Sequence, residues 1–107
     1  MQQLEPIKQG DTFILGCTYK NSSKVAESVS DVEIKSQARR AATNNLVQEF
    51  EIFKSDQTTH PGEFSLSAQT NSWPLGLINI DIQFTYGDIV ISTDTFQVQV
   101  IRDNTHD

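Results

Sequence analysis

The sequence has few of the residues that build most catalytic and metal sites. Its 107 residues include one cysteine, two histidines and five glycines. A single cysteine excludes an internal disulfide framework and any metal site made of several cysteines. The glycines form no phosphate-binding loop, and neither a Gly-x-Ser-x-Gly elbow nor a His-Glu-x-x-His pattern occurs. Few routes to an active site remain, and we expect a fold held together by packing alone.

Positive charge is also scarce. Eight lysines and arginines stand against fourteen aspartates and glutamates, which gives a net charge of −6. This balance repels the phosphate backbone of nucleic acids and the headgroups of anionic lipids. We therefore expect neither nucleic acid nor a membrane surface as a partner, and the sequence predicts no cofactor and no metal.

Long apolar runs are absent, since none approaches the roughly 20 residues that span a bilayer. The longest apolar-rich stretch, residues 75–82, is interrupted by Gly76, Asn79 and Asp81. Residues 1–10 carry neither a basic region nor an apolar core, so we expect no secretory signal peptide.

The length and composition predict one folded domain. A chain of 107 residues can bury a core without disulfides, and 36% hydrophobic residues exclude a disordered acidic segment. We expect a single domain over residues 1–107, with an ordered core at about residues 6–102 and a polar tail at residues 103–107.

Apolar and polar residues alternate with a period of two along most of the chain, which is typical of β-strands. The clearest run covers residues 77–86, whose predicted inward residues are Ile78, Ile80, Ile82, Phe84 and Tyr86. Other strands are expected at residues 13–19, 31–37, 46–53, 64–69 and 89–100. The inward face of the strand at residues 46–53 stays open, because apolar residues occupy both parities.

Turn signals separate these runs. Residues 38–45 show no alternation and end in Asn44-Asn45, so we expect a loop or a short helical turn. Gly87-Asp88 predicts a type II′ hairpin, because glycine tolerates the positive φ of the first central position. Asp94-Thr95 predicts a bend or bulge. About seven short strands favour an all-β, immunoglobulin-like antiparallel β-sandwich, although the cysteine–tryptophan–cysteine spacing of antibody domains is absent.

The candidates for catalysis are few. His60 lies in a turn and His106 in the polar tail, so we expect two solvated loop histidines. Glu49 and Glu51 share one strand face but are expected to be outward, solvated carboxylates. Cys17 shares its parity with apolar neighbours, which favours a small buried side chain over a reactive thiol. The sequence therefore predicts that the chain is not an enzyme.

Three residues are better candidates for contact with a partner. Arg39 and Arg40, with Lys35 nearby, form the positive cluster of the sequence, and adjacent guanidinium groups can clamp a partner's carboxylates. The plainer interpretation of the pair is a charged loop. Trp73 either plugs the open end of the sandwich or is exposed as an anchor, and burial is favoured because large aromatics prefer it.

Short motifs also follow one another in the order seen in a known family. Residues 7–13 read Ile-Lys-Gln-Gly-Asp-Thr-Phe, residues 32–35 read Val-Glu-Ile-Lys ahead of Arg39-Arg40, and residues 73–82 run from Trp-Pro-Leu-Gly to Asp-Ile. In this order they resemble motifs of small tail- and baseplate-associated proteins of tailed bacteriophages, including the N-terminal domains of baseplate upper proteins. A closing hairpin, here Gly87-Asp88, is shared, whereas the family's Asp-Leu-Thr-Gly turn is replaced at residues 27–31.

The resemblance implies a non-enzymatic virion component, made in the bacterial cytoplasm, that docks to other tail, baseplate or neck proteins as a homo- or hetero-oligomer. Contact would come from an apolar or β-edge surface rimmed by charges, with Trp73, Arg39 and Arg40 as candidate residues. The alternative is a recognition module for carbohydrate or a cell surface, in which exposed Trp73 and Tyr86 would stack on sugar rings. An enzyme is the third hypothesis, and it has only His60 and scattered carboxylates behind it.

Overall fold

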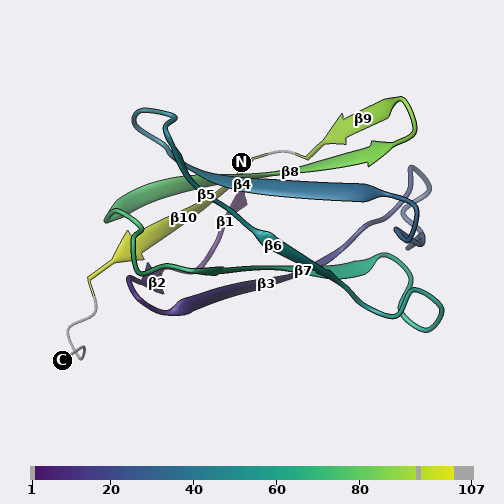
Figure 1. The fold of residues 1–107 in the computed structure, drawn as a ribbon, viewed down its shortest axis with the longest axis horizontal. Coiled ribbons are helices and arrows are strands. Elements are labelled where there is room, and N and C mark those ends of the chain that lie inside the picture. Colours follow the sequence, from purple (N-terminus) through teal and green to yellow (C-terminus); the bar gives the residue numbers. More distant parts are fainter. Residues whose placement is uncertain (1, 94, 103–107) are drawn as a thin grey trace.

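A computed structural model describes residues 2–93 and 95–102 as two β-sheets packed face to face (Figure 1). The larger sheet contains β1 (Gln2–Gln3), β2 (Ile7–Lys8), β4 (Glu33–Arg40), β5 (Leu46–Glu49), β8 (Gly76–Tyr86), β9 (Ile89–Ser92) and β10 (Phe96–Ile101). The smaller sheet contains β3 (Thr12–Thr18), β6 (Glu51–Lys54) and β7 (Glu63–Gln69). No helix occurs among the described residues, so the predicted all-β sandwich is confirmed.

The order of the strands gives the topology. The larger sheet runs β1-β10-β8-β4-β5, with β2 also beside β10 and β9 also beside β8, and the smaller sheet runs β3-β7-β6. The pairs are antiparallel except that β1 and β2 run parallel to β10. The strand order can be compared with that of an immunoglobulin-like sandwich. The smaller sheet, β3-β7-β6, has the order of strands B-E-D, and the path β10-β8-β4-β5 of the larger sheet has the order of strands G-F-C-C′.

The core lies between the sheets and is built from alternate residues of each strand, as the period-two pattern predicts. On β8, Ile78, Ile80 and Ile82 are at most 2% exposed. Their neighbours in the core include Phe13, Ile34, Phe64, Leu66, Ala68, Val98 and Val100. Burial of each large aliphatic side chain stabilises the fold by about 1.5–3 kcal/mol.

Strand β4 continues to Arg40, so the loop predicted to begin at residue 38 is wrong in its first three residues. Ala38 is fully buried opposite Ile80, and Ser36 is 4% exposed with its Oγ donating to Asp81 O at 2.7 Å. Alanine and serine are small and weakly apolar or polar, so these two inward residues produce no visible alternation of apolar and polar residues in the sequence. The turn itself follows at residues 41–45.

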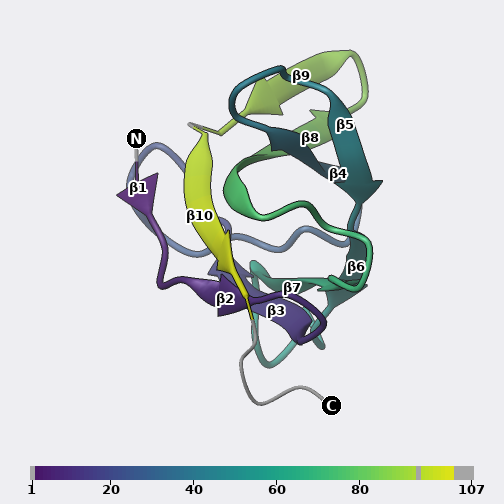
Figure 2. The same cartoon turned by 90° about the vertical axis from the view of Figure 1, so that its left-hand side faces the viewer.

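The strand predicted at residues 46–53 is two strands in two different sheets. β5 pairs with β4 in the larger sheet, and β6 pairs with β7 in the smaller one. Between them, Phe50 is buried and its N–H donates to Ser36 O at 2.9 Å. Figure 2 shows this passage along one side of the sandwich. The inward-facing residues could not be assigned from the sequence, because β5 and β6 face the core from different sheets and so have different inward positions.

The predicted hairpin between β8 and β9 is present, and Gly87 has the expected positive φ, 58°. β9 and β10 both pair with the same side of β8, and the strand is interrupted between Ser92 and Phe96. This interruption confirms the predicted bend, although Asp94 itself lies outside the described residues.

The ordered part of the chain begins earlier than the sequence predicts. β1 precedes residue 6, where order was expected to begin, and Leu4 N–H donates to Gln97 O at 2.8 Å. The parallel pairing with β10 therefore extends the fold toward the N-terminus. The polar tail at residues 103–107 lies outside the described residues.

Trp73 packs between the sheets with Phe13 and Phe50. It is 0% exposed, and its ring centroid lies 5.9 Å from both phenyl rings. Its Nε1 donates to Gln48 Oε1 at 2.8 Å, and its carbonyl oxygen accepts from Gln9 Nε2 at 2.6 Å. A buried indole N–H needs such an acceptor to offset its loss of water. The interpretation of Trp73 as a plug is confirmed.

Gly62 lies where the connection from β6 to β7 touches the segment that follows β3. Its φ is 83°, and a Cβ at this position would lie 2.5 Å from Tyr19 O. Gln57 Oε1 accepts from Gly62 N–H at 2.8 Å and from Val29 N–H at 2.9 Å. The side-chain amide of Gln57 thus joins the β3–β4 connection to the β6–β7 connection. The close approach of Tyr19 O leaves no room for a side chain at Gly62.

Gly62→Ala should lower the free energy of unfolding by about 3 kcal/mol, because it combines a left-handed backbone with a backbone clash. Gly16→Ala is the matched control, since nothing lies within 4 Å of its Cβ position. The control should stay within about 1 kcal/mol of the wild type. Urea unfolding measures both, and equal stability of the two variants would contradict the packing described for Gly62.

The burial of Trp73 predicts its fluorescence. In the folded protein the indole should emit at shorter wavelength than free tryptophan and resist quenching by acrylamide, because no water reaches the ring. Unfolding in urea provides the internal control and should shift the emission to the red. An emission that is already red-shifted and freely quenched before unfolding would show that the plug is wrong.

Candidate functional site

Arg39 and Arg40 occupy successive positions of β4, so their side chains leave opposite faces of the sheet. Arg39 is half-buried, and its two Nη atoms donate to Asn44 O at 3.1 Å and to Gln37 Oε1 at 2.9 Å. Arg40 is exposed. The joint clamp predicted from their adjacency is wrong, because that prediction assumed a loop where the chain forms a strand.

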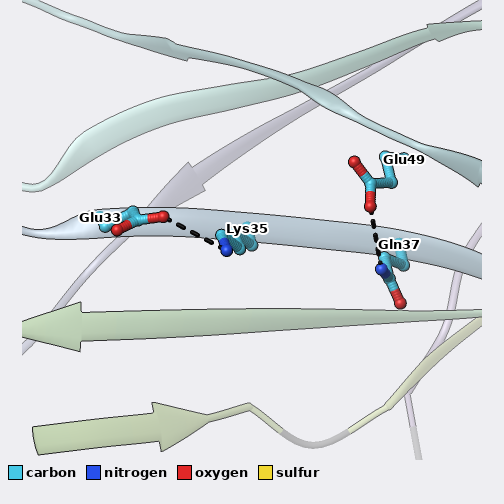
Figure 3. A network of polar contacts seen from close by, with 4 residues as sticks. All are labelled: Glu33, Lys35, Gln37 and Glu49. Atoms are coloured by element: carbon cyan, nitrogen blue, oxygen red, sulfur yellow. Dashed lines mark hydrogen bonds and ion pairs between the residues drawn. The ribbon is translucent and has the colours of Figure 1, made fainter.

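The outer face of β4 is a solvated polar surface (Figure 3). Lys35 Nζ lies 3.4 Å from Glu33 Oε1, and Gln37 Nε2 donates to Glu49 Oε1 at 3.2 Å. An exposed ion pair of this kind contributes at most about 1 kcal/mol. With a carboxylate beside Lys35 and another beside Gln37, this face offers no concentrated positive charge to an acidic partner.

Trp73 has no exposed surface, which removes it from the residues that can contact a partner or stack on a sugar. The prediction of Trp73 as a contact residue is therefore wrong. Tyr86, the second aromatic of the sugar-stacking hypothesis, is 59% exposed.

The catalytic candidates are not brought together. His60 is exposed, with its Nδ1 2.9 Å from Thr59 Oγ1, and His106 lies outside the described residues. Glu49 and Glu51 belong to strands of different sheets, so the shared strand face predicted for them is wrong. Within residues 2–93 and 95–102, no group of three or more histidines, cysteines and carboxylates is placed to hold a metal ion. In the same part of the chain, no helix is long and apolar enough to cross a membrane.

An apolar groove of about 530 Å³, the open-edge groove, lies between β3 and the edge formed by β9 and β10. Its walls include Leu4, Leu15, Cys17, Phe84, Ile91 and Phe96, and Lys20 is the charged residue among the described lining residues. The groove exists because β3 is the last strand of the smaller sheet on this side, while β9 has β8 as its strand neighbour. Among the described strands, none pairs with both β3 and β9.

The hairpin of β8 and β9 extends the apolar surface beyond this groove. Tyr86, Ile89, Val90 and Ile91 are each at least 50% exposed. Ile91 lies opposite Phe84 and Ile89 opposite Tyr86, so three of these side chains continue the inward face of β8. The hairpin extends beyond the end of β3 (Figure 1), and residues of the connection from β3 to β4, not a strand of the smaller sheet, lie across from its inward face.

A second hollow of about 430 Å³, the acidic hollow, adjoins the open-edge groove through Tyr19 and Ile91, which line both. Tyr86 and Ile89 form part of its apolar wall, and Glu27 and Asp31 lie on its rim. None of the described residues lining the acidic hollow is basic. The two hollows are therefore neighbours, and the acidic hollow carries the carboxylates.

The backbone of β9 has an unused side. Thr93 N–H donates to Ile82 O at 2.9 Å, and the register places Ile91 and Ile89 opposite Phe84 and Tyr86. Because hydrogen-bonding direction alternates along an antiparallel strand, Val90 and Ser92 direct their N–H and C=O groups away from β8. An edge of this kind can pair with a further strand.

The alternation and the Gly87-Asp88 pair predict the hairpin but not this surface. The signal was the run Ile89-Val90-Ile91, because a strand with one solvated face should alternate and this one does not. Three consecutive apolar residues indicate two apolar faces. The sequence does not show that no strand of the smaller sheet lies opposite this run, which is why its side chains are exposed.

Cys17, expected to be buried, is half-buried in the wall of the open-edge groove, with its Sγ 3.8 Å from Leu15 O. Burial raises the pKa of the Cys17 thiol above its usual value. The thiolate fraction at pH 8 is therefore smaller than in a solvated cysteine, and the thiolate is the reactive form.

Alkylation of Cys17 by iodoacetamide at pH 8 should thus be slower in the folded protein than in the same protein unfolded in urea. Mass spectrometry of timed samples measures both rates, and the rate in the folded protein should rise with pH above 8. A folded rate equal to or above the unfolded rate would contradict the partial burial of the thiol.

Comparisons with known proteins bear on the fold. No model of a known protein family matches the sequence, and no curated protein matches it. Among solved structures, the chain is similar to an endo-fucoidan hydrolase from glycoside hydrolase family 107, with a TM-score of 0.61 and 11% sequence identity. The match covers 94% of this chain and 12% of the hydrolase chain, so this chain spans only a small part of that protein's length. At this identity the likeness is one of β-sandwich fold.

Proposed function

We propose that this protein is a non-catalytic assembly module that binds another protein through the open-edge groove and the β8–β9 hairpin. The observation that carries the proposal is the continuity of exposed apolar surface, from the groove of about 530 Å³ to Tyr86, Ile89 and Ile91, each at least 50% exposed. Apolar surface gathered in this way on one face is characteristic of protein interaction sites.

We infer further that the assembly is a phage or prophage particle, in its tail, baseplate or neck. Support comes from the short motifs that resemble phage tail and baseplate proteins, and from a surface that an isolated chain leaves open. The partners are then other virion proteins or further copies of the chain.

The carbohydrate alternative has less support. It depends on two exposed aromatic residues, and Trp73 lies in the core. Tyr86 remains, and Glu27 and Asp31 in the same hollow can accept hydrogen bonds from a sugar, but the adjoining side chains of Ile89 and Ile91 offer it none. Aliphatic neighbours of this kind suit a protein partner better.

Ile91→Thr is the variant that tests the function. Threonine keeps the branched shape that favours strands but loses apolar area, and at 50% exposure the cost in stability should stay within about 1 kcal/mol. Leu46→Thr is the matched control, because Leu46 is also 50% exposed but lies on β5, at the opposite edge of the larger sheet.

The measurement is the amount of tagged protein in density-gradient-purified particles from cells that carry the encoding phage or prophage. Wild type and Leu46→Thr should be incorporated equally, and Ile91→Thr at least tenfold less. Absence of the wild type from particles would refute the virion role. Equal incorporation of Ile91→Thr would refute the proposed surface.

A further inference from the structure

We propose that the occupant of this surface is an extended strand of a partner protein, which pairs with the free edge of β9, fills the open-edge groove with aliphatic side chains and places a basic side chain in the acidic hollow. The inference rests on the proposed function and adds the chemistry of the partner.

On the side away from β8, the larger sheet has one further strand position beside β10 and β9, here called the outer row. Next to β10 this row is filled by β1 and β2, which pair with it in parallel. Next to β9 the same row is empty in the described chain, and Val90 and Ser92 direct their N–H and C=O groups into it. A partner strand in this position would continue the row of β1 and gain backbone hydrogen bonds.

The pleat of a β-strand determines where the side chains of the partner strand would lie. In a strand added beside β9, every second side chain would project onto the inward face, next to Ile89 and Ile91. From there it would enter the open-edge groove, whose walls include Leu15 and Phe96. Such a lining accepts aliphatic side chains and penalises polar ones, so the matching sequence alternates apolar and polar residues.

Charge decides between a different protein and a second copy of this chain. Glu27 and Asp31 rim the acidic hollow, and the whole chain carries a net charge of −6. Two copies would repel each other, whereas a lysine or arginine of a partner could lay its stem along Ile89. Its cationic head would then lie near both carboxylates and the ring of Tyr86.

Synthetic peptides serve as the probe. The test peptide has eight residues that alternate threonine with valine or isoleucine, with an added arginine at each end. A second peptide carries glutamates at the ends, and a third replaces both middle residues with proline. Binding of fluorescently labelled peptide is measured by anisotropy, and protection of Cys17 from iodoacetamide reports whether the peptide lies in the groove.

The decisive pair of variants is Val90→Pro and Val90→Thr. Both lose the valine side chain, but only proline removes the N–H directed away from β8, so the pairing of β9 with β8 is kept. We expect Val90→Thr to bind the arginine peptide within twofold of the wild type and Val90→Pro to bind at least tenfold more weakly. Thermal unfolding confirms that each variant is folded. Equal binding by the two variants, or binding of the proline peptide as tight as that of the test peptide, would overturn strand pairing.

The acidic hollow is tested separately. The double variant Glu27→Gln, Asp31→Asn should bind the arginine peptide several-fold more weakly and lose the preference of the wild type for arginine over glutamate ends. An unchanged preference would overturn the proposed basic residue. Self-association that depends on Ile91 in sedimentation experiments would replace the partner strand by a second copy and overturn the proposal.

The partner strand and the assembly function can be tested independently of each other. If no peptide binds while particle incorporation still depends on Ile91, the strand is wrong and the assembly function stands. If incorporation does not depend on Ile91, the assembly function through this surface is wrong whatever the peptides do.

Discussion

A sheet of three strands cannot cover the inward face of the larger sheet that lies over it. Phe84 packs against Tyr19, which follows β3, and against Phe64, near the start of β7, so the hairpin residues beyond Phe84 lie past the strands of the smaller sheet. Phe84 is 7% exposed under the smaller sheet, whereas Tyr86, two residues further on the same face, is 59% exposed. The same apolar alternation that builds the core therefore also leaves apolar surface in contact with water at the hairpin, and burial of that surface would be favourable.

The remainder of the sandwich is closed by specific contacts. Trp73 joins the sheets through Phe13 and Phe50, and its indole N–H is satisfied by Gln48. Buried Thr70 accepts from Gly10 N–H at 2.9 Å and donates to Asp11 O at 2.6 Å, which ties the start of β3 to the end of β7. The side of the sandwich at the hairpin has no comparable closing contact among the described residues, and Tyr86, Ile89, Val90 and Ile91 are each at least 50% exposed there.

Sequence reasoning succeeded where one apolar face lies against a full layer. The alternation at residues 77–86 predicts β8 and its five inward positions, of which all but Tyr86 are buried, and Gly87-Asp88 predicts the hairpin. It failed where small or polar residues face inward, as Ser36 and Ala38 do, because neither marks a buried face. It also failed at Phe50, where the chain changes sheets and local parity loses its meaning.

For the candidate site, the sequence determined the chemistry available, and the tertiary structure decided where it lies. Composition excluded a cysteine-based metal site, and the run at residues 89–91 contains the apolar side chains of the hairpin. Only the packing of the two sheets exposes that run and buries Trp73, and only the extension of β4 to Arg40 sends Arg39 and Arg40 to opposite faces. The reason is that alternation records which side of a strand is apolar but not whether a second sheet lies over that side.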